Sequence, residues 1–296
     1  MIYIRMRTDL KAACRIFLKY YNGCNVFTMN KISKESNWLS RVPIELHGHR
    51  KKLNFFIKSL EKYREALSKE RSNISVIEVG CSNGRNISFP LAEYGYQVTG
   101  VDIHTQSIDW ANKNNNFSNA AFICQDFSHF SSDEKFDAVI LSDILEHVEN
   151  PLEIIQFSEN HLKENGIILI CIPNGFGPYE LEQRILRMTR INLLIAKAIR
   201  QVKKILGRKE EKQAEYNYDS GHIQFFTQKD IEKLADQVGC EIKDKANGAL
   251  FGGDFTYIFG ILLPFIVKPS LWLANYVPSV FASTWYFRLQ QSDKKK

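Results

Sequence analysis

The feature that most constrains the fold is a change of hydrophobic period at Asn73. From there on, short runs rich in β-branched and other apolar residues alternate with helical patterns. Five such runs, ISVIEV, YQVTGVDI, AAFICQDF, FDAVILSDI and GIILICIPN, start at residues 74, 96, 120, 136 and 166. Largely apolar runs separated by helices are typical of parallel strands that are buried on both faces. The sequence therefore predicts an α/β fold with a doubly wound, mostly parallel sheet.

The polar residues that precede these runs are biased toward helix. Apolar side chains recur there on one helical stripe, at Leu53, Phe56, Leu60, Tyr63 and Leu67. We therefore expect a helical N-terminal cap over residues 1–72 and one α/β domain over residues 73–296.

Two further strands are expected near the end of the chain. Thr227 is a natural N-cap with Asp230 three residues on, and Gly239 is a natural C-cap, so a helix should fill the interval. A strand should follow from Cys240, and residues 282–290 alternate like a last strand. The prediction is a seven-stranded sheet.

Two segments interrupt the α/β alternation, at about residues 177–220 and 249–281. In the first, Leu181–Leu206 has apolar residues at helical spacing and basic residues on much of the remainder. Such a basic amphipathic helix can lie in the headgroup region of an anionic membrane, or pack over the active site with its charges in water. The second segment is strongly apolar. Its run Ile258–Val267 is too short to span a bilayer, but it is long enough to dip into one or to roof an apolar substrate.

The positive charge is concentrated rather than spread. Net charge is +6, from 39 basic and 33 acidic residues, and nine Lys or Arg fall between Arg184 and Lys209. A local surplus of this kind suggests an anionic surface, such as phospholipid or nucleic acid.

The six cysteines include no C-x-x-C pair and indicate reduced thiols. Charged residues interrupt the N-terminal stretch, which therefore lacks the apolar core of a secretory signal. We expect a cytoplasmic protein, with the inner membrane face as a candidate peripheral location.

A glycine turn follows the first run, in the stretch VIEVGCSNGR. Gly80, Ser82 and Gly84 lack bulky side chains, as a turn from a strand into a helix requires where a ligand approaches the backbone. Asp102, at the tip of the second strand, can accept hydrogen bonds from ribose hydroxyls. Taken alone, the turn could also be a tight strand-to-helix connection that binds no ligand. The acid at the end of the second strand makes this alternative less favoured.

The third strand end adds a second acid. Asp126 follows FICQ, where a carboxylate could accept a hydrogen bond from an adenine amino group, with Phe127 or Ile103 against the ring.

Taken together, these motifs resemble class I S-adenosylmethionine-dependent methyltransferases. The motifs are E-V-G-C-S-N-G at 78–84, the acids in VTGVDI and CQDF, FDAVILSDILEHV, GIILICIPN and HIQFFTQKDIEKLADQVGCEI. The likeness is greatest to the small-molecule branch that includes the ubiquinone-biosynthesis O-methyltransferases, and it covers about residues 74–175 and 221–248. Ser82 departs from the family, which usually has glycine there.

The resemblance implies a Rossmann-like fold and S-adenosyl-L-methionine as cofactor. Glu78 and Gly80 would lie at the methionine end. Asp102 would hold the ribose, and Asp126 with Phe127 the adenine. The full set of cofactor positions it implies is Glu78, Gly80, Ser82, Gly84, Asp102, Ile103, Asp126, Phe127 and Asp143.

The end of the fourth strand offers candidates for the chemistry. An alcohol or phenol acceptor must lose a proton, and His147 is the first choice as base because an imidazole titrates near neutral pH. Packing within the following helix is the alternative for His147. Asp143 and Glu146 could accept a substrate hydrogen bond, bind the donor's ammonium, or be solvated acids at a helix start. His222 could face the substrate where the insertion rejoins the core, or be structural.

His47 and His49 adjoin a basic run and could form part of a lid. An H-x-H pair without cysteines or ordered acids is a poor ligand set, so we expect no metal site.

The apolar and basic insertions favour an apolar or lipid-attached acceptor for the methyl group. We expect O-methylation of a small molecule, a lipid, a quinone-like ring or a lipid-linked glycan, near an anionic membrane surface. An RNA or protein methyltransferase is the alternative enzyme. Nucleic acid is less favoured because the basic face is not interleaved with stacking aromatics. A non-catalytic binding protein that retains the fold is the alternative outside enzymes. Nothing in the sequence indicates an oligomeric state.

Overall fold

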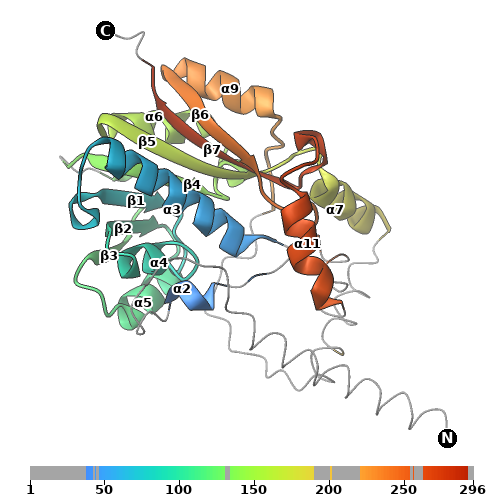
Figure 1. The fold of residues 1–296 in the computed structure, drawn as a ribbon, viewed down its shortest axis with the longest axis horizontal. Helices are drawn as coiled ribbons and strands as arrows, with labels where there is room; N and C mark the ends of the chain where they lie inside the picture. Colours follow the sequence, from blue (N-terminus) through green and yellow to red (C-terminus); the bar gives the residue numbers. More distant parts are fainter. Residues whose placement is uncertain are drawn as a thin grey trace, which may run out of the picture.

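The structure is a computed structural model that describes residues 38–42, 44, 47–130, 134–189, 201, 221–253, 256 and 263–292 (Figure 1). Most of the predicted basic helix Leu181–Leu206, much of the predicted N-terminal cap and much of the run Ile258–Val267 therefore lie outside the described residues.

Seven strands form one sheet in the order β3-β2-β1-β4-β5-β7-β6. The first five are parallel neighbours, and β7 runs antiparallel to both β5 and β6. The seven-stranded, mostly parallel, doubly wound sheet expected from the sequence is confirmed. Only β5 departs noticeably from its predicted start, since it begins at Leu162 rather than at residue 166. The bounds are β1 Ser75–Val79, β2 Gln97–Asp102, β3 Ala120–Cys124, β4 Phe136–Ser142, β5 Leu162–Pro173, β6 Cys240–Asn247 and β7 Thr284–Gln291.

Helices connect the strands and cover the sheet. Among the described residues, the α-helices are α2 Trp38–Arg41, α3 His49–Ala66, α4 Ser88–Glu93, α5 Thr105–Asn114, α6 Pro151–Asn160, α7 Pro178–Thr189, α9 Gln228–Gln237 and α11 Val267–Leu273. Short 3-10 turns occupy Arg71–Asn73, Phe127–His129, Leu145–His147, Pro264–Ile266 and Ser279–Phe281. Within the residues described, no helix combines the length and the apolarity needed to cross a membrane.

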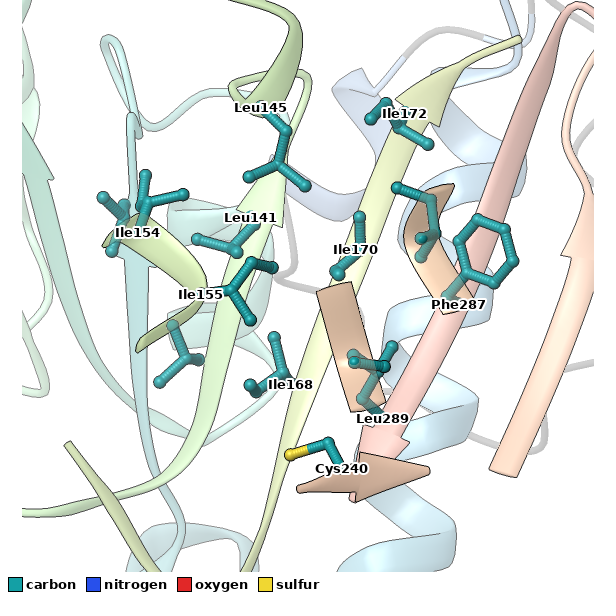
Figure 2. Close-up of a cluster of buried hydrophobic side chains, with 14 of the residues drawn as sticks. Leu141, Leu145, Ile154, Ile155, Ile168, Ile170, Ile172, Cys240, Phe287 and Leu289 are labelled. Atoms are coloured by element: carbon teal, nitrogen blue, oxygen red, sulfur yellow. The ribbon is translucent and has the colours of Figure 1, made fainter. Parts of the chain in front are cut away.

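Strand residues alternate between two buried layers, because successive side chains point to opposite faces. Ile77 and Val139 belong to the layer covered by α6 and α9, whereas their neighbours Val76 and Ala138 belong to the layer covered by α3 and α4. Figure 2 shows the first layer, where residues of β4, β5 and β7 pack against Ile154 and Ile155 of α6. Burial on both faces explains why the strand runs read as continuously apolar.

Helix α3 packs directly on the sheet and contacts β5 and β7. Four members of its predicted stripe are buried, namely Leu53, Phe56, Leu60 and Tyr63. The fifth, Leu67, is exposed because the helix ends at Ala66. At the other end of the domain, the predicted N-cap Thr227 forms a capping box with Asp230, and Gly239 has the left-handed φ of 70° that a C-cap glycine adopts.

Candidate functional site

The predicted site residues gather at the carboxyl edge of the sheet, where the strand order reverses beside β1. The chain passes from β1 to β2 and β3 on one side and to β4 and β5 on the other. Crevices at such a switch point are where open α/β sheets bind ligands. The loop after β1 and the ends of β2, β3 and β4 all open on this edge.

The loop after β1 has an unusual backbone. Gly80, Ser82 and Gly84 all have left-handed φ angles, of 74°, 50° and 71°. A Cβ on Gly80 would lie 2.6 Å from Cδ1 of Ile144, and one on Gly84 would lie 2.6 Å from Cε1 of Phe122. Glycine is therefore required at both positions by conformation and by space. Ser82 adopts the same region with a side chain, at a cost of about 1 kcal/mol or more.

Asp102 braces this loop. One carboxylate oxygen accepts a hydrogen bond from the backbone N–H of Ser82 at 2.7 Å, and the other accepts from the N–H of His104 at 2.8 Å. The acid at the tip of β2 and the glycine loop after β1 are thus joined directly. Ile103, the next residue, is 65% exposed on the same edge.

Asp126 lies on the rim, after the neighbouring strand. Its carboxylate accepts from the backbone and the hydroxyl of Ser128, both at 2.9 Å, and these bonds hold the pKa of Asp126 below its usual range. The ring of Phe127 packs edge-on against Phe157 at 5.8 Å. The structure therefore places Asp126 and Phe127 at the same sheet edge as Asp102, with Asp126 engaged in its own turn.

Glu78 lies beneath the loop, inside the protein. It is buried and accepts a hydrogen bond from the hydroxyl of Ser88. Burial raises the pKa of Glu78 to about 8, so the carboxyl is largely protonated at neutral pH.

A cavity of about 190 Å³ lies between the end of β4, the start of α3, α7 and β7. It brings together all three predicted catalytic residues, Asp143, His147 and His222, although His222 is 75 residues beyond His147 in the chain. His47 and His49 also line it. Burial, reinforced by Lys52, lowers the pKa of His49 to about 3, so this imidazole is neutral.

Asp143 is ion-paired with Lys52, which the sequence analysis did not single out. Asp143 also accepts from the thiol of Cys171 at 3.0 Å and from the hydroxyl of Ser142 at 3.1 Å. Burial alone would raise the pKa of Asp143, but the Lys52 ammonium outweighs it and lowers the pKa. A signal for Lys52 was present in the sequence, because this charged residue stands four positions before Phe56 on the apolar stripe of α3.

Glu146 is among the most buried residues that line this cavity. The side chain is 2% exposed, and neither carboxylate oxygen has a hydrogen-bond partner among the described residues. Burial raises the pKa of Glu146 well above its usual range, and the charge of Asp143 adds to the effect. His147 follows it, and burial lowers the pKa of this imidazole.

The rings of His147 and His222 pack edge-on against each other, with their centroids 5.0 Å apart. Nδ1 of His222 is hydrogen-bonded to the carboxylate of Glu180, and Nδ1 of His147 lies 3.4 Å from the carbonyl oxygen of Gly221. Glu180 is buried in α7, and the sequence analysis missed it because nothing local distinguishes it from a solvated acid at a helix start.

The loop also fits a polar ligand. Oγ of Ser82 and Nδ2 of Asn83 are buried without a hydrogen-bond partner among the described residues. Unsatisfied polar atoms beside a strained glycine loop are what the amino and carboxylate groups of a bound amino-acid moiety would satisfy. In S-adenosylmethionine, that moiety is the methionine end.

Comparison with known proteins identifies the family. The sequence profile described as the methyltransferase domain matches residues 49–245, which include α3. A ubiquinone biosynthesis O-methyltransferase of Rickettsia conorii is 32% identical over 117 residues, which cover 39% of this chain and 40% of that protein. The enzyme of the same name from Glaesserella parasuis is 37% identical over 108 residues, or 33% of this chain and 45% of that protein. The matched stretch spans about half the length, or less, of these curated relatives.

Solved structures share the fold at low sequence identity. The plantazolicin methyltransferase BpumL, solved with a triazolic desmethylPZN analog and SAH, superposes with a TM-score of 0.50 at 18% identity, over 97% of this chain and 99% of that one. PKMT2 from Rickettsia typhi gives a TM-score of 0.50 at 14% identity, over 76% of this chain and 50% of that one. The resemblance that the motifs indicated is confirmed: the chain belongs to the methyltransferase domain family and resembles class I S-adenosylmethionine-dependent methyltransferases, among them the ubiquinone-biosynthesis O-methyltransferases.

Proposed function

We propose that the protein transfers the methyl group of S-adenosylmethionine to an oxygen atom of a small apolar or lipid-linked acceptor near a membrane surface. The observation that carries this proposal is the continuity of residues 143–147. Ile144 packs against Gly80 of the glycine loop, while Asp143, Glu146 and His147 line the cavity. A donor on the loop and an acceptor in the cavity would therefore share one wall, as an in-line displacement at the methyl carbon requires.

The donor would lie along the carboxyl edge. Its methionine end would contact the loop from Gly80 to Gly84, which includes Ser82, and the buried Glu78 would lie under that loop. Asp102 would accept from the ribose hydroxyls, and the Asp102–Ser82 hydrogen bond supports this because it fixes loop and acid relative to each other. The adenine would lie between Ile103 and Phe127, with Asp126 at its amino group.

When bound, the donor supplies an electrophilic methyl group on a sulfonium. Transfer would form a bond between the acceptor oxygen and the methyl carbon as the carbon–sulfur bond breaks, with the electron pair of that bond left on sulfur. The acceptor's hydroxyl proton must leave in the same step or before it. His147 and His222 face the cavity and assist its loss, while Asp143, held by Lys52, is placed to accept a hydrogen bond or to bind the donor's ammonium.

Exposed apolar side chains around the cavity support an apolar acceptor and a nearby membrane. The α7 stripe of Leu181, Ile185 and Met188 faces away from the core, and Met188 is 85% exposed. Trp272 and Tyr276, in the connection between β6 and β7, are also exposed. α7 and that connection both reach the cavity, through Tyr179 and Phe251. Exposed aromatic and aliphatic side chains near a cavity are typical of binding surfaces for apolar or interfacial ligands.

The reaction can be tested with the full chain and donor carrying a labelled methyl group, incubated with lipid, quinone, glycan and RNA fractions. We expect label in an apolar or lipid-linked fraction, bound through oxygen. Label in RNA or protein alone would contradict the proposed acceptor. No donor binding by calorimetry, with the fold intact, would favour a non-catalytic binding protein.

The membrane part has its own test, in co-sedimentation with anionic liposomes. We expect binding to fall in the double variant Trp272→Ser and Tyr276→Ser. The buried Trp285 makes a poor control, so the matched control is Trp110→Ser, a partly exposed tryptophan on α5. Full recovery of the unmodified protein in the supernatant would remove the membrane proposal and leave the methyl-transfer proposal standing.

A further inference from the structure

The cavity at the carboxyl edge is small for the acceptor that the proposed function requires. Its volume is about 190 Å³, whereas sites for small molecules usually measure about 300–1,000 Å³. Strands β5 and β7 contribute to its lining and belong to the large buried clusters of the domain, so moving them would disrupt the core. To bind an apolar or lipid-linked acceptor, the cavity must enlarge on another side.

The wall that includes Ala249 and Phe251 is the part of the lining best suited to move. Ala249 also packs against Val267 and Leu271 of α11, and these three residues form a small buried cluster that is separate from the other three hydrophobic clusters of the described chain. We call residues 263–283, which contain α11, the strap. It lies beside the start of α3 (Figure 1). A segment with so few buried apolar contacts belongs to the low-stability part of a fold.

Hydrogen bonds from side chains outside the strap hold it in place. Nζ of Lys51, in the first turn of α3, donates to the carbonyl oxygen of Leu271 at 2.8 Å and to that of Gly248 at 2.7 Å. Nδ2 of Asn247 donates to two further carbonyl oxygens of the strap, including that of Ala274 at 2.9 Å. Leu271 is in the last turn of α11, where carbonyl groups lack a partner within the helix and a cation is favoured.

The ammonium of Lys51 has no carboxylate partner among the described residues; its bonds are to neutral carbonyl groups. Burial without a neutralising charge lowers the pKa of Lys51 to about 8. The adjacent Lys52, by contrast, is paired with Asp143. Because the Lys51 ammonium is partly desolvated when it bonds the strap and regains water when the strap moves away, the contact is readily reversed.

The first turn of α3 is an unusual place for three successive cations. Arg50, Lys51 and Lys52 lie where the helix dipole favours acids, and the turn contains none. Each of the three bonds a different part of the chain. Arg50 donates to the carbonyl oxygen of Val42, Lys51 bonds the strap, and Lys52 is paired with Asp143. The turn therefore connects the strap, through adjacent residues, to the end of β4.

We propose that the strap opens to admit the acceptor, and that Lys51 is the latch whose hydrogen bonds hold it closed. The inference rests on the proposed function, because the acceptor belongs to that proposal. When the Lys51 bonds break, α11 loses the contact at its last turn and the wall at Ala249 loses its support, so the cavity enlarges on this side. When they form again, the closed strap shields the reacting atoms from water, as lids of other enzymes do.

Hydrogen exchange of the full chain, read by mass spectrometry on its peptides, tests the latch. Lys51→Met removes the ammonium and keeps the length of the side chain. We expect amide exchange over residues 267–274 to become about tenfold faster or more, while exchange over α6 stays within about twofold. Lys51→Arg, which keeps a cation and its donors, should restore most of the slow exchange. The matched control is Lys58→Met, an exposed lysine of the same helix, which should exchange as the unmodified protein does.

The accessibility of Cys171 shows whether the cavity itself opens. This buried thiol lines the cavity, whereas the equally buried Cys240 lies in the layer covered by α9. Labelling by N-ethylmaleimide, followed by peptide mapping, should be about threefold faster or more at Cys171 in Lys51→Met and unchanged at Cys240. Asn247→Ala, which removes the other bonds to the strap, should act in the same direction.

Unchanged exchange over residues 267–274 in Lys51→Met would overturn the latch. Equal acceleration over α6 would overturn it too, because the whole domain would then be less stable and the strap would not move by itself. Faster exchange without faster labelling of Cys171 would overturn the opening of the cavity.

Activity separates the two proposals. Faster exchange and labelling in Lys51→Met, with no methyl transfer by the unmodified protein to any acceptor fraction, would support the strap and contradict the proposed function. Methyl transfer to an apolar fraction, with exchange and labelling unaffected by Lys51→Met, would support the proposed function and overturn the strap.

Discussion

At the scale of single residues, the ion pair of Lys52 and Asp143 joins helix α3 to the carboxyl edge of the sheet. The Lys52 side chain is 7% exposed, whereas Asp143 opens onto the cavity and is 39% exposed. Asp143 has a left-handed φ of 54° although it is not glycine. Because the ion pair with Lys52 holds Asp143 in this strained conformation, it also fixes the direction of the chain through residues 144–147.

Replacing Lys52 should show how much the pair contributes. Lys52→Met leaves Asp143 without its cation, so the pKa of Asp143 should rise and the free energy of unfolding should fall. Breaking a fully buried pair costs about 3–5 kcal/mol, and the exposure of Asp143 reduces this to roughly 1–3 kcal/mol. Urea unfolding at pH 7 measures the change.

The control for this experiment is Lys62→Met. Lys62 pairs with Asp244 at the surface, and loss of an exposed pair should cost less than about 1 kcal/mol. Equal effects of the two substitutions would contradict the structural role given to Lys52.

Asp102 offers a test of the donor site. Asp102→Asn keeps the shape of the side chain but removes the charge that the ribose hydroxyls and the N–H groups of Ser82 and His104 would share. A hydrogen bond to a charged group contributes about 1.5–3 kcal/mol, so calorimetry should show donor affinity about 10–100-fold weaker. Asp109→Asn, on the exposed side of α5, should bind normally. Unchanged affinity in Asp102→Asn would remove the ribose assignment.

At the scale of elements, Asp137 of β4 forms hydrogen bonds that connect this strand to β1, β5 and the C-terminal part of α3. This fully buried acid of β4 accepts from Ser75 of β1, from Lys163 of β5, from Tyr63 of α3 and from Lys69, which follows α3. Burial alone would raise the pKa of Asp137, but the bonds from Lys163 and Lys69 outweigh it and lower the pKa to about 2.

The stability of the protein should therefore depend on pH through Asp137. Because its folded-state pKa is below the unfolded value near 4, its contribution is present above that value and is lost as pH falls toward 2. The contribution is about 2 kcal/mol. Urea unfolding of Asp137→Asn should show its largest deficit at pH 6–7, and the deficit should shrink below pH 4. A deficit independent of pH would mean that packing, rather than charge, is what the substitution disturbs.

At the scale of the whole molecule, donor binding should stabilise the fold. The loop after β1, the tip of β2 and the start of α4 would all contact one ligand, and a ligand that binds only the folded state adds about 2.7 kcal/mol at a concentration 100 times its Kd. For a chain of this size, Tm should rise by about 5–10 °C. Differential scanning fluorimetry with S-adenosylmethionine measures this shift.

The control for that experiment is a mixture of methionine and adenosine. Neither compound alone connects the glycine loop, where methionine would bind, to the strand tips, where adenosine would bind. They should produce a smaller shift than the intact donor. An equal shift would indicate that the loop and the strand tips do not act as one site.

Much of the architecture follows from the sequence alone. Short apolar runs, helical stripes and capping residues are local patterns, and they predict strands and helices because period and turn chemistry act over a few residues. The positions of Gly80, Gly84 and Asp102 followed in the same way, since strand ends of a parallel sheet meet at one edge. The family, and with it the cofactor, could be predicted from motifs that stay close together in the chain.

Only the tertiary structure decided which distant side chains meet. Lys52 and Asp143 are 91 residues apart, and Glu180 and His222 are 42 apart. A charge on an apolar helix face or an acid at a helix start has many candidate partners in sequence. Its partner is selected when α3 and α7 pack across the carboxyl edge and exclude water, because burial makes an unpaired charge costly. The sheet was therefore determined locally, and the chemistry of the cavity by long-range packing.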